Sequence, residues 1–149
     1  MGRPSGLVAA ILVAAGVVLV LGGAAAVAVG LFNPGLISSQ LPPEAAVDAP
    51  AVGGAAVALG IATALLGVVH IGTALALRVG IGIAATTAVV LSATMAILSL
   101  VFAVAAVVSI ASGAAPAIYM VPASVGLGAG VIGYSVVTVV IIGARGKPI

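Results

Sequence analysis

Four long apolar runs determine what this chain can fold into. They extend over about 7–32, 51–77, 81–112 and 117–143, and none of them contains Lys, Arg, Asp or Glu. The hydrocarbon core of a bilayer is about 30 Å thick and an α-helix rises about 1.5 Å per residue, so about 20 apolar residues make one crossing. The sequence therefore predicts a polytopic integral membrane protein with four transmembrane helices.

The four runs are predicted to be helices, so the fold class is all-α. Backbone groups inside lipid find no water, so only helices and closed barrels satisfy them, and barrel strands need only about 9–11 residues. Of the 149 residues, 64% are hydrophobic and 4% are charged, whereas roughly a quarter of a soluble domain is charged. We expect residues 1–149 to form a single membrane domain, an antiparallel bundle of four helices.

Turn residues mark the connections between the runs. The first run stops at Asn33-Pro34-Gly35, a turn signal. The connection 33–50 is rich in proline, so we expect it to be extended and semi-rigid, on the outer side of the membrane. Arg78 interrupts the apolar sequence after the second run, and that connection must be short. Gly113 and Pro116 are predicted to end the third run.

The basic residues predict the orientation of the chain. Four crossings place all of them on one side of the membrane: Arg3, Arg78, Arg145 and Lys147. Cytoplasmic loops are enriched in Lys and Arg, so both termini are predicted to be cytoplasmic, in the plasma membrane. The only acids, Glu44 and Asp48, fall in the connection 33–50. Arg78, Arg145 and Lys147 are interpreted as residues that fix the topology or contact phospholipids.

Small residues in the second run predict how its helix packs. At alternating spacings of three and four, a small-residue stripe follows one face: Gly53, Ala56, Gly60, Thr63, Gly67, His70 and Ala74. In lipid, helices associate through close van der Waals contact and hydrogen bonds, which small residues favour. A seven-residue repeat also favours the shallow crossing angle of an antiparallel bundle.

Similar spacings recur in the other runs. The repeat of seven appears as Gly16, Gly23 and Gly30 in the first run and as Ser92, Ser99, Ala106 and Gly113 in the third. In the fourth run, Gly126-x-x-x-Gly130 could seat a right-handed contact with a partner helix. The chain contains 21 glycines, so chance matches are an alternative explanation for such spacings.

His70 is the only side chain well inside a predicted span that titrates near neutral pH, so it is the first candidate for a functional site. Beside small neighbours, a histidine could ligate haem, carry a proton or hydrogen-bond a quinone. Alternatively, His70 bonds a hydroxyl or a backbone carbonyl and fixes helix packing. No cofactor is predicted for the chain alone, but a haem or quinone shared with a partner remains a hypothesis.

Several residue patterns that carry chemistry are absent from the sequence. There is no cysteine, no carboxylate in any span and no basic patch, which argues against thiolate chemistry, ion-coupled transport and nucleic-acid binding. No nucleophile elbow, phosphate loop or histidine pair at metal spacing occurs either. The chain resembles small four-span multidrug exporters in size and number of spans. It lacks the first-span glutamate of that family, however, and this counts against that function.

These features lead to three hypotheses for the function. The first is a non-catalytic accessory subunit that packs against larger membrane proteins of a respiratory, transport or secretion complex. The alternative is a homo-oligomeric transporter, pore or lipid-binding protein, which would require a polar face that reaches both ends of a span. The third is a haem- or quinone-associated membrane anchor that uses His70.

Overall fold

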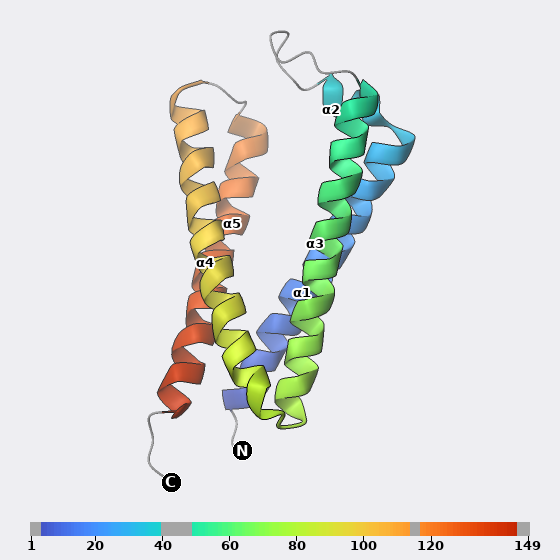
Figure 1. The fold of residues 1–149 in the computed structure, drawn as a ribbon. Coiled ribbons are helices and arrows are strands. Elements are labelled where there is room, and N and C mark those ends of the chain that lie inside the picture. Colours follow the sequence, from blue (N-terminus) through green and yellow to red (C-terminus); the bar gives the residue numbers. More distant parts are fainter. Residues whose placement is uncertain (1–3, 40–48, 114–116, 146–149) are drawn as a thin grey trace. The chain divides into compact units, whose positions relative to one another are not determined.

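The structure is a computed structural model that describes residues 4–39, 49–113 and 117–145 (Figure 1). It contains four long helices and a short one: α1 (Pro4–Phe32), α2 (Pro34–Ser38), α3 (Ala49–Arg78), α4 (Gly82–Ala111) and α5 (Ala117–Arg145). None of these described residues forms a strand. The long helices are all long and apolar enough to cross a membrane, which confirms the prediction of four apolar helices.

The four long helices exceed the minimum length for a crossing. They contain 29 or 30 residues each, which corresponds to about 45 Å of helix. A bilayer is about 30 Å thick in its hydrocarbon core and about 40–45 Å thick with its headgroups. Helices of this length either tilt or extend their ends into the headgroup region.

The described part of the connection after α1 contains a short helix, where the prolines of segment 33–50 predicted an extended segment. α1 ends at Phe32, and Asn33 leaves the helical conformation with φ −147° and ψ 57°. Pro34 then begins the five-residue helix α2, and Pro50 is the second residue of α3. Proline suits the first turn of a helix because that turn needs no backbone N–H donor. Glu44 and Asp48 lie outside the described residues.

The connection between α3 and α4 is a tight turn of residues 79–81, which confirms the predicted short connection at Arg78. The N–H of Ile81 donates to the Ala76 carbonyl at 3.0 Å, and the N–H of Gly80 donates to the Leu77 carbonyl at 3.3 Å. Gly80 has φ +77°, a conformation that glycine adopts without a steric penalty. This pair of bonds is the Schellman motif, which satisfies the last carbonyls of α3.

A glycine also follows the end of α4. The helix stops at Ala111, and the N–H of Gly113 donates to the Ile110 carbonyl at 3.1 Å. Gly113 has φ +70°, so the chain leaves the helix where the sequence predicted its end.

The residues fall into two compact units. One unit, Leu12–Gly72, contains most of α1, all of α2 and most of α3. The other unit consists of Met1–Ile11 and Thr73–Ile149, and it contains α4 and α5 together with the start of α1 and the end of α3.

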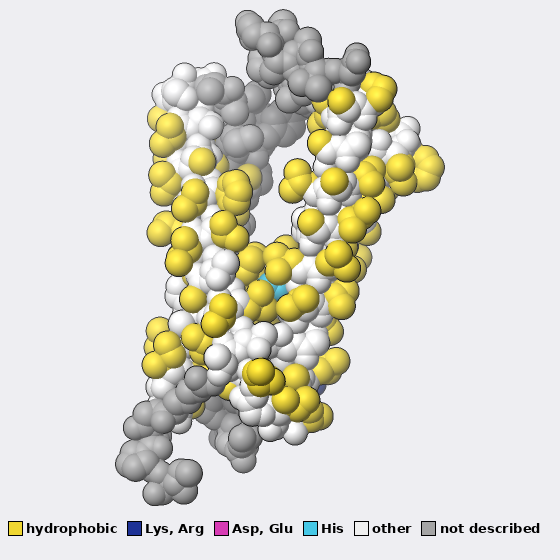
Figure 2. Space-filling view, viewed as in Figure 1, with side chains coloured by type: hydrophobic (Ala, Val, Ile, Leu, Met, Phe, Trp, Pro, Cys, Tyr) yellow, Lys and Arg dark blue, Asp and Glu magenta, His cyan; other side chains and the backbone are white. Residues whose placement is uncertain are grey.

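Large aliphatic side chains lie on the outside of the helices. Leu21, Leu59 and Val139 each expose about two thirds of their surface, and Figure 2 shows hydrophobic side chains over the visible face. Most buried positions hold alanine, glycine or serine instead. A surface of this kind suits lipid as its solvent, and small interior residues let helix backbones approach closely.

Candidate functional site

Glycines of α1 and α3 bring the two helix backbones into direct contact. For each glycine, an added Cβ atom would meet the carbonyl oxygen of a glycine on the other helix, and the relation is reciprocal. The pairs are Gly16 with Gly67, Gly23 with Gly60, and Gly30 with Gly53. The residue number falls by seven on α3 for every rise of seven on α1, so the two helices run antiparallel in this unit.

These contacts leave no space for a larger side chain. A Cβ atom on Gly60 would lie 2.6 Å from the Gly23 oxygen and 2.9 Å from the Val27 backbone nitrogen. Both neighbours are backbone atoms, so only a separation of the helices could relieve the overlap. Approach at this distance also suits weak Cα–H···O bonds between helices, which contribute about 0.5–1 kcal/mol each.

The remaining members of the small-residue stripe have different neighbours. Ala56 lies beside Gly30 of α1, whose Cβ position is 3.1 Å from the Ala56 Cβ. Thr63 donates its hydroxyl to the Leu59 carbonyl of its own helix at 2.8 Å. Ala74 is fully buried and belongs to the other unit. The face predicted as one stripe is therefore divided between two sets of contacts.

His70 lies inside the contact between α1 and α3 and has 0% of its surface exposed. Its Nδ1 lies 2.8 Å from the Leu66 carbonyl oxygen one turn earlier. A carbonyl only accepts, so Nδ1 carries the proton and donates in this bond. The His70 Cβ lies 3.1 Å from the Cβ position of Gly16. The ring is thus hydrogen-bonded to its own helix, and the side chain lies against Gly16 of α1 at its Cβ.

This environment limits the chemistry available to His70. Axial ligation of haem requires a ring nitrogen that faces an open space large enough for the macrocycle. The fully covered ring of His70 has no such access in this arrangement. Within the described residues, no group of three or more His, Cys, Asp or Glu side chains could hold a metal ion.

The glycine pair of α5 has one member in a helix contact. A Cβ atom on Gly130 would lie 3.1 Å from the Ser99 hydroxyl oxygen and 3.6 Å from the Ser99 Cβ. A Cβ atom on Gly126 would meet no atom within 4 Å. Gly130 therefore faces α4 within its own unit, whereas Gly126 faces open space.

Ser92 of α4 is a buried polar residue whose special position the sequence reasoning missed. It has 0% of its surface exposed, and its Oγ has no hydrogen-bond partner among the described residues. A hydroxyl buried without a partner costs about 1–3 kcal/mol. The seven-residue spacing to the buried Ser99 places both on one face of α4. That spacing could have predicted burial but not the missing partner.

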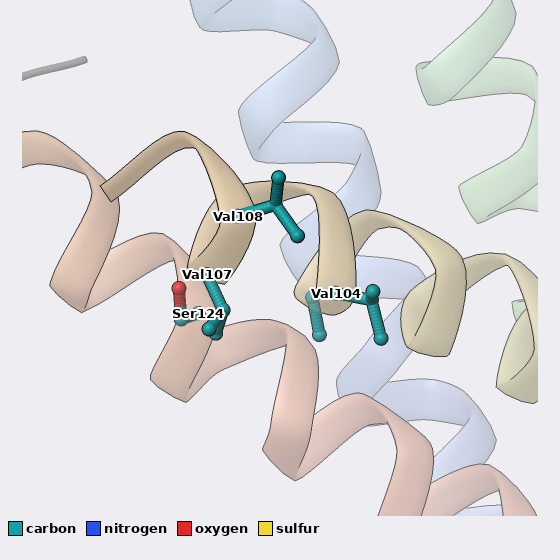
Figure 3. Close-up of a pocket in the computed structure, with 5 residues that line it drawn as sticks. Val104, Val107, Val108 and Ser124 are labelled. Atoms are coloured by element: carbon teal, nitrogen blue, oxygen red, sulfur yellow. The ribbon is translucent and has the colours of Figure 1, made fainter. Parts of the chain in front are cut away.

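An open groove of about 250 Å³ lies between α4 and α5 (Figure 3). Its lining consists of aliphatic side chains and one serine: Ala103, Val104, Val107, Val108 and Ser124. No sequence pattern predicted it. A groove of this composition can accept hydrocarbon, but it presents no acid, base or nucleophile pair for catalysis.

The basic residues lie at helix ends. Arg78 is the last residue of α3 and its side chain is exposed. Arg145 is the last residue of α5, and Lys147 lies outside the described residues.

Comparison with protein-family models, curated proteins and solved structures finds no match for this chain.

Proposed function

We propose that this chain is a non-catalytic small subunit that packs against larger proteins of a membrane complex of the respiratory, transport or secretion type. The observation that carries the proposal is the enclosure of His70, the only side chain inside a span that titrates near neutral pH. Its Nδ1 donates to the Leu66 carbonyl, and its Cβ lies against Gly16 of α1. The side chain within the spans that is best suited to acid–base or ligand chemistry therefore serves in helix packing.

We further propose that the four helices form an antiparallel bundle in the plasma membrane, with both termini cytoplasmic. Antiparallel contact of α1 with α3 and the tight turn from α3 to α4 support alternating directions. The positive-inside rule supports the orientation, since Arg78 and Arg145 end α3 and α5.

The alternative, a self-assembling pore or carrier, requires a continuous row of polar groups along a span. α4 comes closest to that requirement. Its Thr87 and Ser109 hydroxyls donate to carbonyls of the same helix, at 3.2 Å from Ile83 and 2.9 Å from Ala105. Its Ser92 and Ser99 are buried. Hydroxyls that bond to their own helix or lie buried are not available to water. They favour a packing role for α4 over a role as the wall of a water-filled pore.

Extraction from the native membrane in a mild detergent, followed by mass spectrometry, tests the proposed subunit role. A C-terminally tagged chain and an untagged control are purified in parallel, at low and at high salt. We expect larger membrane proteins to co-purify with the tagged chain at a molar ratio near one. Their association should survive high salt, because contacts between apolar helix faces are not screened by ions. Recovery of a clean homo-oligomer would overturn the proposal.

A further inference from the structure

The turn between α3 and α4 combines one arginine with large exposed aliphatic side chains. Arg78 is exposed at the end of α3, and Val79 exposes 75% of its surface. Ile81 exposes 51% and Ile83 exposes 74%. Side chains of this size would be unfavourable in water, with about 25 cal/mol for each Å² of apolar surface. The turn therefore needs an apolar neighbour that tolerates a positive charge.

The backbone of this turn can enter a poorly hydrated environment. The carbonyl oxygens of Leu75, Ala76 and Leu77 accept hydrogen bonds from the N–H groups of residues 79, 81 and 80, at 3.0–3.3 Å. The N–H of Ala84 in the first turn of α4 donates to the Ile81 carbonyl at 3.0 Å. Backbone N–H and C=O groups without a hydrogen-bond partner are costly near lipid. In this turn, many of these groups are hydrogen-bonded to each other.

No anionic side chain of the described residues is available to Arg78, because that part of the chain contains neither Asp nor Glu. The two acids, Glu44 and Asp48, precede α3 in the sequence. α3 contains 30 residues, so its two ends are about 45 Å apart. The counter-charge for the Arg78 guanidinium must come from outside these helices.

We propose that the α3–α4 turn lies at the boundary between headgroups and acyl chains, where Arg78 binds the phosphate of an anionic phospholipid. Val79, Ile81 and Ile83 then contact the adjoining acyl chains. A phospholipid complements both features of the turn, and the planar guanidinium matches phosphate with two parallel bonds. The proposal rests on the membrane-spanning assignment and is independent of the subunit role.

Lipid binding by the purified full-length protein tests the role of Arg78. Native mass spectrometry in detergent counts the bound lipid as phosphatidylglycerol or phosphatidylcholine is added. We expect the wild type to prefer phosphatidylglycerol and Arg78→Gln to bind it about five-fold less tightly, the effect of one basic residue near an anionic surface. Arg78→Lys should have an intermediate affinity for phosphatidylglycerol, because lysine keeps the positive charge but lacks the two parallel N–H donors of the guanidinium. Arg145→Gln removes the same charge at the end of α5 and is the matched control; we expect it to lower the preference for phosphatidylglycerol less than Arg78→Gln does.

The depth of the turn is tested separately in the otherwise cysteine-free chain. Val79→Cys and Ile83→Cys are treated with a water-soluble maleimide in inverted membrane vesicles, with Lys147→Cys as the aqueous control. We expect both turn positions to react several-fold more slowly than position 147. This measurement needs no change at Arg78, so it holds even if the Arg78 variants do not fold.

Each result decides part of the proposal. Equal labelling at positions 79, 83 and 147 would show that the turn lies in water and would overturn it. Slow labelling together with an equal loss of lipid preference in Arg78→Gln and Arg145→Gln would overturn the specific role of Arg78. Neither outcome depends on whether larger subunits co-purify, so the two proposals fail separately.

Discussion

Glycine positions on α3 differ sharply in what surrounds them, although the residue type is the same. A Cβ atom on Gly60 would overlap backbone atoms of α1, whereas a Cβ atom on Gly54 would meet no atom within 4 Å. Helix propensity alone favours alanine over glycine by about 1 kcal/mol. Any loss of stability at Gly60 must therefore come from the contact with α1.

We expect Gly60→Ala to destabilise the protein by about 1–2 kcal/mol, because overpacking costs about 1–3 kcal/mol and propensity offsets part of that cost. Gly54→Ala is the matched control and should be neutral or slightly stabilising. Unfolding by titration with a denaturing detergent, followed by circular dichroism, measures both variants. Equal stability of the two variants would contradict the close contact of Gly60 with Gly23.

Ser92→Ala should stabilise the protein by about 1 kcal/mol, because it removes a buried hydroxyl that has no hydrogen-bond partner in the described structure. Ser109→Ala on the same helix is the control, since Ser109 donates to the Ala105 carbonyl at 2.9 Å. We expect that control to be unchanged or slightly less stable. A lower melting temperature for Ser92→Ala than for wild type would mean that its hydroxyl is bonded.

His70 is expected to act through packing. His70→Ala should destabilise the protein by about 2 kcal/mol, since it leaves a cavity between α1 and α3 and removes the bond to Leu66. The absorption spectrum of the wild type, purified from its native membrane, should show no Soret band. A Soret band that is lost in His70→Ala would establish the third hypothesis, a haem anchor.

At the scale of elements, the register between α4 and α5 depends on which glycine of α5 faces Ser99. The Cβ position of Gly130 is 3.6 Å from the Ser99 Cβ, within the range of about 3.5–4.5 Å seen in disulfides. Gly126 lies one turn away from Gly130 and has no atom within 4 Å of its Cβ position.

We therefore expect Ser99→Cys combined with Gly130→Cys to form a disulfide on mild oxidation in membranes. The chain contains no other cysteine, so a mass decrease of the intact protein measures the bond directly. Ser99→Cys combined with Gly126→Cys is the control and should stay largely reduced. Faster oxidation of the control pair would show that α5 is shifted along α4 by about one turn relative to this structure.

The sequence predicted the number and approximate ends of the long helices better than it predicted the contacts between them. Span length follows from hydropathy, so four long helices could be predicted, and Gly113 marked the end of α4. Equal steps of seven in the first two runs were visible, but the pairing of Gly23 with Gly60 needs a register that no single helix encodes. The contact of Gly130 with Ser99, and the open space beside Gly126, depend on the register and rotation of α5 against α4. Small residues on several faces leave that rotation open.

The other differences between prediction and structure come from local backbone preferences and from contacts with neighbouring helices. The prolines near α2 predicted an extended connection, yet Pro34 and Pro50 lie in first turns of helices, where proline is equally suited. The missing partner of Ser92 and the groove beside Ser124 depend on rotamers and neighbouring helices. Neither can be derived from residue spacing along one helix.

In the whole molecule, the four apolar helices and the distribution of charge together predict the topology. The basic residues Arg78 and Arg145 lie at the ends of α3 and α5, and the acids Glu44 and Asp48 precede α3. If each helix crosses once, these two groups lie on opposite sides of the membrane. Three crossings without the first run, or five crossings with the third run split, would place basic residues on both sides.

Topology mapping with reporters tests whether the chain crosses the membrane four times with both termini in the cytoplasm. A reporter active only in the cytoplasm and one active only outside it are each fused after Lys147 and, in separate fusion proteins, inserted between Pro43 and Asp48. The account predicts a cytoplasmic signal after Lys147 and an external signal at the inserted site. Signals on the same side from both sites would contradict four crossings with cytoplasmic termini.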